Sequence, residues 1–226
     1  MSERVLIVAA HPDDEVLGCG GVAARHAAAG DKVFLQILAE GSASRFGNSL
    51  DAIDSVMALR KSATDAAKIM GVSDLELLRF PDNKMDTMAQ LDVNRAVELA
   101  IDRWKPTTVY THHAYDLNVD NRVVHEAVMT ACRPMPAQVV RQILCFEVAS
   151  STEWQTPGVG SFTPQLFIDI SDYWETKKAA MACYASEMRP WPHVRSMEAL
   201  EHQARLRGAS VGCAAAEAFM VARILR

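Results

Sequence analysis

Four ionisable side chains stand close together near the start of the chain, in the segment His11-Pro12-Asp13-Asp14-Glu15. They directly follow an apolar run over residues 5–10, which predicts a buried strand that ends where they begin. Four ionisable groups in one turn desolvate and repel one another unless a cation or solvent compensates them. The turn is therefore a candidate site for a metal ion or for proton transfer.

These side chains suit separate tasks. His11 and Asp14 are three residues apart across a turn and can converge on one divalent metal, and this pairing of nitrogen and oxygen suits zinc. Asp13 can then face a metal-bound water as a general base. A dinucleotide fold would need a Gly-x-Gly-x-x-Gly turn here, and the carboxylates would repel its phosphates. Helix capping would account for the aspartates, one of which we expect to cap the next helix, but not for His11.

Apolar runs alternate with longer amphipathic stretches along the first half of the chain. They predict strands over residues 4–10, 33–38, 75–78 and 108–111, and helices over 16–29, 52–70, 89–104 and from about 122 to 132. The second half predicts strands over 143–148 and 166–170 and helices over 173–184 and 197–207. This alternation indicates βαβ units, so we predict one α/β domain over residues 1–226 with a mostly parallel central sheet.

A second polar segment follows the predicted strand over residues 108–111, and it reads Thr-His-His-Ala-Tyr-Asp-Leu-Asn-Val-Asp-Asn-Arg over residues 111–122. In open parallel sheets, ligands bind beyond the carboxyl ends of the strands where the strand order reverses. The first strand is usually central in such sheets. We therefore expect this segment to lie beside residues 11–15 and to offer further ligands.

With these two segments the chain resembles the PIG-L/LmbE-like family of zinc-dependent N-deacetylases. Residues 10–15 match the first motif of that family in full, and residues 116–122 match its second motif, in the branch with Asn at position 118. Weaker matches are residues 44–45, 80–82, 184–189 and 216–219. The resemblance implies a Rossmann-like three-layer α/β fold, a Zn²⁺ cofactor and hydrolysis of an acetamido group, usually on a sugar.

The resemblance also implies roles for single residues. It places His11 and Asp14 as zinc ligands, Asp13 as the general base and Asp120 in a supporting role beside the site. The last metal ligand of the second motif is a histidine, and it falls at position 121, where this chain has Asn121.

An amide oxygen is a weaker zinc ligand than an imidazole, which leaves three hypotheses open. Asn121 gives a weakened zinc site, another histidine (His112, His113 or His125) substitutes for it, or the metal is lost. In the last case the chain is a sugar-binding protein or an inactive enzyme. The first hypothesis predicts that Asn121→His raises zinc affinity and the deacetylase rate.

Further residues are candidates for contact with the substrate. The family position for the oxyanion donor carries Asn118, which can donate a hydrogen bond but cannot serve as a charged acid. Arg45, Asp82 and His112 each follow a predicted strand and are candidate substrate contacts. Arg195 lies in a polar stretch between the last two helices, which we expect to form a substrate rim or a subunit contact.

Composition limits the partners and the compartment. The 226 residues carry a well-mixed net charge of −5, without the Lys/Arg stripe that nucleic acid requires. No apolar run approaches the ~20 residues of a membrane span, and the start of the chain lacks a signal-peptide layout. Five scattered cysteines favour reduced thiols in the cytoplasm. We expect a small N-acetylated sugar as partner, leave a homo-oligomer open, and keep an amidase acting on another N-acyl metabolite as the alternative.

Overall fold

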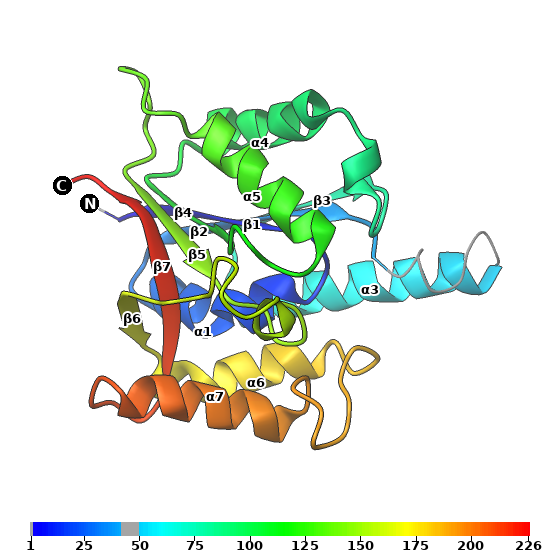
Figure 1. Ribbon diagram of the computed structural model, residues 1–226, viewed down its shortest axis with the longest axis vertical. Coiled ribbons are helices and arrows are strands. Elements are labelled where there is room, and N and C mark those ends of the chain that lie inside the picture. Colours follow the sequence, from blue (N-terminus) through cyan, green and yellow to red (C-terminus); the bar gives the residue numbers. More distant parts are fainter. Residues whose placement is uncertain (1, 42–49) are drawn as a thin grey trace.

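The computed structural model describes residues 2–41 and 50–226, and its strands form one seven-stranded sheet (Figure 1). The strands are β1 Arg4–Ala9, β2 Lys32–Ala39, β3 Asp74–Phe80, β4 Thr108–His112, β5 Gln142–Phe146, β6 Leu166–Asp169 and β7 Ala216–Ile224. Their order in the sheet is β3-β2-β1-β4-β5-β7-β6. The first five strands pair in parallel, and β7 runs antiparallel to both of its neighbours. The predicted mostly parallel sheet is confirmed.

Helices cover both faces of the sheet and make three layers (Figure 1). The α-helices are α1 Asp14–Ala28, α3 Leu50–Ile69, α4 Gln90–Trp104, α5 Val119–Ala131, α6 Trp174–Ala182 and α7 Met197–Ala209. Three short 3-10 helices are η1 Met85–Thr87, η2 Thr152–Trp154 and η3 Ser171–Tyr173. One apolar cluster joins the sheet to α1, α3, α6 and α7, and a second joins its other face to α4 and α5. None of the helices in the described ranges is long and apolar enough to cross a membrane.

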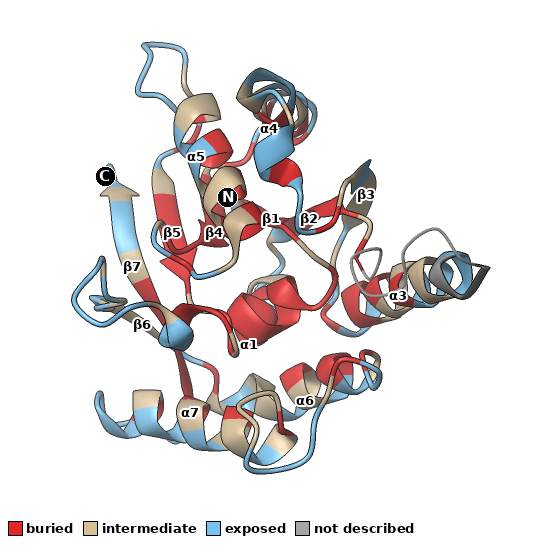
Figure 2. Cartoon of the chain, turned by 45° about the vertical axis from the view of Figure 1, so that its right-hand side comes forward, coloured by how far each residue is buried: buried red, intermediate tan, exposed pale blue. Residues whose placement is uncertain are grey.

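Helix α1 is buried along most of its length and packs directly on the sheet (Figure 2). A Cβ atom added to Gly18 would stand 2.3 Å from the Phe146 ring, and one added to Gly21 would stand 2.8 Å from Ile170. Both distances are far shorter than a van der Waals contact. Glycine is therefore what allows this helix to lie close enough to hold the turn that precedes it.

The same helix is interrupted at Cys19, whose φ of −151° is not helical. The carboxylate of Glu217 in β7 accepts hydrogen bonds from the N–H groups of Gly21 (3.0 Å) and Val22 (2.7 Å), just beyond the interruption. Lys177 of α6 lies 2.6 Å from the same carboxylate. This buried ion pair ties α1, α6 and β7 together.

Two predictions differ from the structure. Strand β7 was not predicted, because its sequence is rich in alanine and lacks a run of β-branched residues. Helix α5 begins at Val119 and not near Arg122, because Asn118 caps it by accepting from Asp120 N–H at 2.8 Å. Asp120 and Asn121 therefore stand in the first turn of a helix.

The order of the strands brings the two polar segments together as predicted. From β1 the chain proceeds to β2 and β3 on one side, and then returns to β4 on the other side of β1. Residues 11–15 and 113–121 thus leave neighbouring parallel strands at the same edge of the sheet.

Candidate active site

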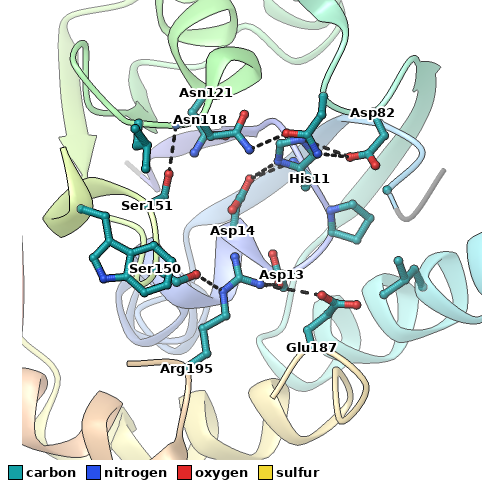
Figure 3. A pocket seen from close by; sticks show the side chains of 16 residues that line it. His11, Asp13, Asp14, Asp82, Asn118, Asn121, Ser150, Ser151, Glu187 and Arg195 are labelled. Carbon is teal, nitrogen blue, oxygen red and sulfur yellow. Dashed lines mark hydrogen bonds and ion pairs between the residues drawn. The ribbon is translucent and has the colours of Figure 1, made fainter. Parts of the chain in front are cut away.

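A cavity of about 290 Å³ opens at this edge of the sheet, and side chains from both segments line it. Figure 3 shows His11, Asp14, Asp82, Asn118 and Asn121 gathered toward the top of the view, with Ser151 beside them and the remaining labelled side chains, Asp13, Ser150, Glu187 and Arg195, lower down. The first group comes from the loops after β1, β3 and β4, together with the first turns of α1 and α5.

The turn after β1 has an unusual backbone at Asp13, whose φ of 111° favours glycine. Asp13 is the N-cap residue of α1, but its side chain makes no capping bond, so the capping bond expected from one of the two aspartates is not made by Asp13. Glu15 stabilises the turn instead, because its Oε2 accepts the Asp13 N–H at 3.0 Å while its Oε1 accepts the Tyr184 hydroxyl at 2.5 Å. Burial raises the pKa of Glu15 to about 8.

His11 lies among three carboxylates. Its Nδ1 is 3.1 Å from Asp14 Oδ2, and its Nε2 is 3.0 Å from Asp120 Oδ2 and 3.5 Å from Asp82 Oδ1. Burial by itself lowers the pKa of His11, but the hydrogen bonds to Asp120 and Asp14 outweigh it and raise that pKa well above its usual value. The pKa of Asp14 is lowered to about 2, because the His11 hydrogen bond and the nearby positive charges outweigh the effect of burial.

Asp120 is fully buried, and its orientation is fixed by the backbone after β3. Its Oδ2 accepts the Asn83 N–H at 2.7 Å, and its Oδ1 accepts the Met85 N–H at 2.9 Å. A carboxylate held in this way can accept a hydrogen bond from the Nε2–H of His11, which leaves Nδ1 as the nitrogen that faces Asp14. This is a common arrangement behind a metal-bound histidine.

Asn121 is 1% exposed, and its side-chain amide is turned in a defined direction. Its Nδ2 donates to Asp116 Oδ1 at 3.1 Å, while its Oδ1 has no hydrogen-bond partner among the described residues. Asp116 cannot turn away, because it also accepts from the hydroxyls of Ser151 and Thr152 and from the Asn118 N–H. A buried carbonyl oxygen left unpaired costs about 1–3 kcal/mol, and a cation or a water would offset that cost.

Three residues that line the cavity carry donor atoms that fit a divalent cation. His11 Nδ1, Asp14 Oδ2 and the unpaired Asn121 Oδ1 comprise one imidazole nitrogen, one carboxylate oxygen and one amide oxygen, all of which bind metals in proteins. In a different combination, the ligand-type atoms of His11, Asp82 and Asp120 lie within 4.8 Å of one another.

Arg195 is a residue of the site whose partner could not be predicted from the sequence. Its Nη1 lies 2.5 Å from Asp13 Oδ2 and 3.8 Å from Glu187 Oε2, and its Nε donates to Ser150 Oγ at 2.6 Å. Burial raises the pKa of Asp13 to about 7, although the charge of Arg195 acts in the opposite direction. The polar stretch between the last two helices predicted a substrate rim or a subunit contact. No local pattern in the sequence pairs residue 195 with residue 13.

The remaining predicted substrate contacts have different positions. Asp82 lines the cavity and is 5% exposed. His112 is fully buried and does not line the cavity, because its Nε2 accepts the Ala10 N–H at 2.8 Å. Arg45 lies outside the described residues. Trp154 also lines the cavity and is half-exposed.

Fold and site together define a Rossmann-like α/β protein with metal-type donors and a buried carboxylate at the switch point of its sheet. The chain belongs to the PIG-L family, described as GlcNAc-PI de-N-acetylase, whose model matches residues 6–132 and so more than half of the chain.

Curated and solved relatives agree with this assignment. An uncharacterized deacetylase of Escherichia coli, YaiS, is 31% identical over 191 residues, covering 80% of this chain and 90% of its own. A 4-oxalmesaconate hydratase of Pseudomonas putida is 26% identical over 205 residues, covering 84% and 76% of the two chains. The structure of an N,N'-diacetylchitobiose deacetylase from Pyrococcus horikoshii superposes with a TM-score of 0.80 at 19% identity, over 98% of this chain and 84% of that one. Family membership and the first relative support a deacetylase.

Proposed function

We propose that this protein is a zinc-dependent hydrolase that removes the acetyl group from the acetamido group of an N-acetylated sugar or sugar conjugate. The observation that carries the proposal is the convergence of His11, Asp14 and Asp13 on one cavity. Hydrolysis of an amide needs an electrophile at the carbonyl oxygen and a base for the attacking water. Membership of a de-N-acetylase family supports this reaction.

His11, Asp14 and Asn121 are the residues that would hold the metal. The unpaired Oδ1 of Asn121 and the position of His11 Nδ1 beside Asp14 support this set. A bound zinc ion would polarise the acetamide carbonyl and lower the pKa of a bound water toward ~7. Asp120 acts behind His11, since it engages Nε2 and leaves Nδ1 toward Asp14.

Asp13 is the residue that would move the proton. Arg195 engages its Oδ2, so Oδ1 is the oxygen that accepts a proton from the attacking water. A pKa of about 7 suits both halves of the task, because the same carboxyl can take a proton near neutral pH and return it to the leaving amine. Arg195 keeps the carboxylate in one orientation through these steps.

The other residues predicted to contact the substrate would orient it. The Nδ2 of Asn118 donates to Asn83 Oδ1 at 3.0 Å and supplies a candidate donor for the oxyanion of the tetrahedral intermediate. Asp82 and Arg45 remain proposed contacts to sugar hydroxyls. His112 would act indirectly, by holding the backbone of the turn through the Ala10 N–H.

Acetate release across a panel of acetamido sugars and non-sugar N-acetyl amines tests the proposal. The wild-type chain loaded with zinc should release acetate from one or more sugars of the panel. Asp13→Asn should lower kcat by about 100-fold or more, because general-base catalysis contributes that much, while bound zinc stays equimolar. The matched control is Asp172→Asn, which alters an exposed carboxylate of η3 and should leave kcat unchanged.

Three outcomes would replace the proposal. Release of acetate from the non-sugar amines alone would identify an amidase for another class of metabolite. The relative named as a hydratase makes hydration the second candidate, and an unsaturated oxo-diacid added to the panel tests it. A chain that binds acetamido sugars but purifies without metal and hydrolyses none of them would be a binding protein.

A further inference from the structure

One imidazole serves the cation site. Of the seven histidines, all of which lie in the described part of the chain, His11 is the one that lines the cavity. A second imidazole ligand would have to come from the neighbouring segment after β4 or from the facing turn of α5.

The histidines in β4, in the loop after β4 and in α5 each have one ring nitrogen engaged by a backbone group. The Nε2 of His112 accepts the Ala10 N–H at 2.8 Å, and losing that bond would unpair a buried backbone donor. His113 places its Nε2 2.6 Å from the Gly160 carbonyl oxygen. His125 directs its Nδ1 to the carbonyl oxygen of His112 at 2.9 Å. His112 Nε2 also lies 3.6 Å from Asp14 Oδ2, and its Nδ1 has no hydrogen-bond partner among the described residues. None of the three histidines lines the cavity, however, whereas Asn121 does, so the geometry favours Asn121 over a substitute histidine.

Oxygen atoms make up the rest of the donor set. Asp14 supplies a carboxylate oxygen beside Nδ1 of His11. Asn121 supplies an amide oxygen that is buried and unpaired, and its direction is fixed because Asp116 holds the amide nitrogen on the other side. Asp82 and Asp120 lie at Nε2, on the other side of the same ring, and so stand behind His11 and outside this donor set.

We propose that this oxygen-dominated site binds Mn²⁺ with an affinity within about 10-fold of its affinity for Zn²⁺. Imidazole and thiolate donors favour zinc strongly, whereas carboxylate, carbonyl and water donors suit manganese and magnesium. Asn121 is the residue that sets the ratio of the two affinities, because it supplies an amide oxygen as the third donor beside His11 and Asp14. The inference rests on the proposed function, since it names the metal selectivity of the same site.

Competition titration tests the proposal on the full chain freed of metal. ZnCl₂ and MnCl₂ are titrated separately against a chromophoric chelator, and the ratio of the two association constants is measured. Asn121→His should raise the ratio of Zn²⁺ to Mn²⁺ affinity by at least about 10-fold, because it adds a second imidazole. The matched control, Asn94→His, adds an imidazole on α4 away from the cavity and should leave the ratio unchanged.

A second variant keeps the proposal testable if the first one folds poorly. Asn121→Ala removes the amide oxygen without adding bulk, and Mn²⁺ affinity should fall by about 10-fold or more. Pulsed electron paramagnetic resonance of bound Mn²⁺ should detect a single coordinated imidazole in the wild type. A wild-type Zn²⁺ affinity well over 10-fold above the Mn²⁺ affinity would overturn the proposal. An unchanged affinity in Asn121→Ala, or an unchanged metal ratio in Asn121→His, would also overturn it.

The two proposals fail in different ways. All of these measurements use the metal ion alone, so a chain that releases no acetate can still show the expected metal ratio. Conversely, acetate release by a chain with a zinc preference that Asn121→His does not change would retain the deacetylase and remove the inference about selectivity.

Discussion

Replacement of Lys177 by methionine should destabilise the protein strongly, because it leaves a buried carboxylate without its positive partner. Lys177 Nζ lies 2.6 Å from Glu217 Oε1 and donates to the Leu17 carbonyl oxygen at 2.9 Å. The two side chains of the pair are only 7% and 4% exposed. The carboxylate cannot reach solvent by a simple rotation, since it also accepts from Gly21 and Val22.

The magnitude follows from what remains after the substitution. Removing one partner of a buried ion pair costs about 3–5 kcal/mol of the free energy of unfolding. The two backbone N–H groups still stabilise the Glu217 charge, so we expect the lower end, about 3 kcal/mol. In the double variant Lys177→Met/Glu217→Gln neither charge is present and one acceptor oxygen is kept. One backbone N–H and the Leu17 carbonyl oxygen also lose their partners. The cost should therefore be about 2 kcal/mol, close to that of two lost hydrogen bonds.

Urea unfolding at pH 7, followed by tryptophan fluorescence, measures these differences. The matched control is Lys178→Met, which removes a neighbouring lysine whose side chain is 39% exposed and should change stability by less than about 0.5 kcal/mol. The reasoning is refuted if Lys177→Met unfolds within about 1 kcal/mol of the wild type. It is also refuted if the double variant is less stable than Lys177→Met alone.

Three further predictions concern the site, the packing of α1 and the thiols. Arg195→Lys should lower kcat for acetate release about 10- to 100-fold with little change in KM, because a lysine cannot hold the proposed general base through the same set of contacts. An unchanged kcat in steady-state assays would remove Arg195 from the mechanism. Gly18→Ala should cost about 1–3 kcal/mol in the same urea titration, because its Cβ would overlap the Phe146 ring, and wild-type stability would contradict the packing. A thiol reagent at pH 7 should label Cys183 and Cys213 quickly in the folded protein, and the three buried thiols only after unfolding. Burial raises the pKa values of those three thiols and blocks access to them. Mass spectrometry that finds rapid labelling of a buried thiol would contradict this burial.

Much of the first half of the fold could be predicted because its signals are local. Continuous apolar runs mark the buried parallel strands, and glycine or proline marks the ends of most helices between them. The turn at residues 11–15 could be assigned to the carboxyl end of a central strand for the same reason. Strand β7 was not predicted, because its alanine-rich sequence has little strand propensity. Its pairing with β5 and β6 in the tertiary structure is what makes it a strand.

The sequence by itself determined which donors are present: one histidine and two aspartates in the first turn, and asparagines at positions 118 and 121 of the second segment. Tertiary structure decided how they are used. Arg195 reaches Asp13, which lies 182 positions earlier in the chain. Asp116 turns the amide of Asn121, because hydroxyls from the loop after β5 hold that carboxylate in place. Such contacts depend on the directions of side chains from distant elements, and no local pattern of residues specifies those directions.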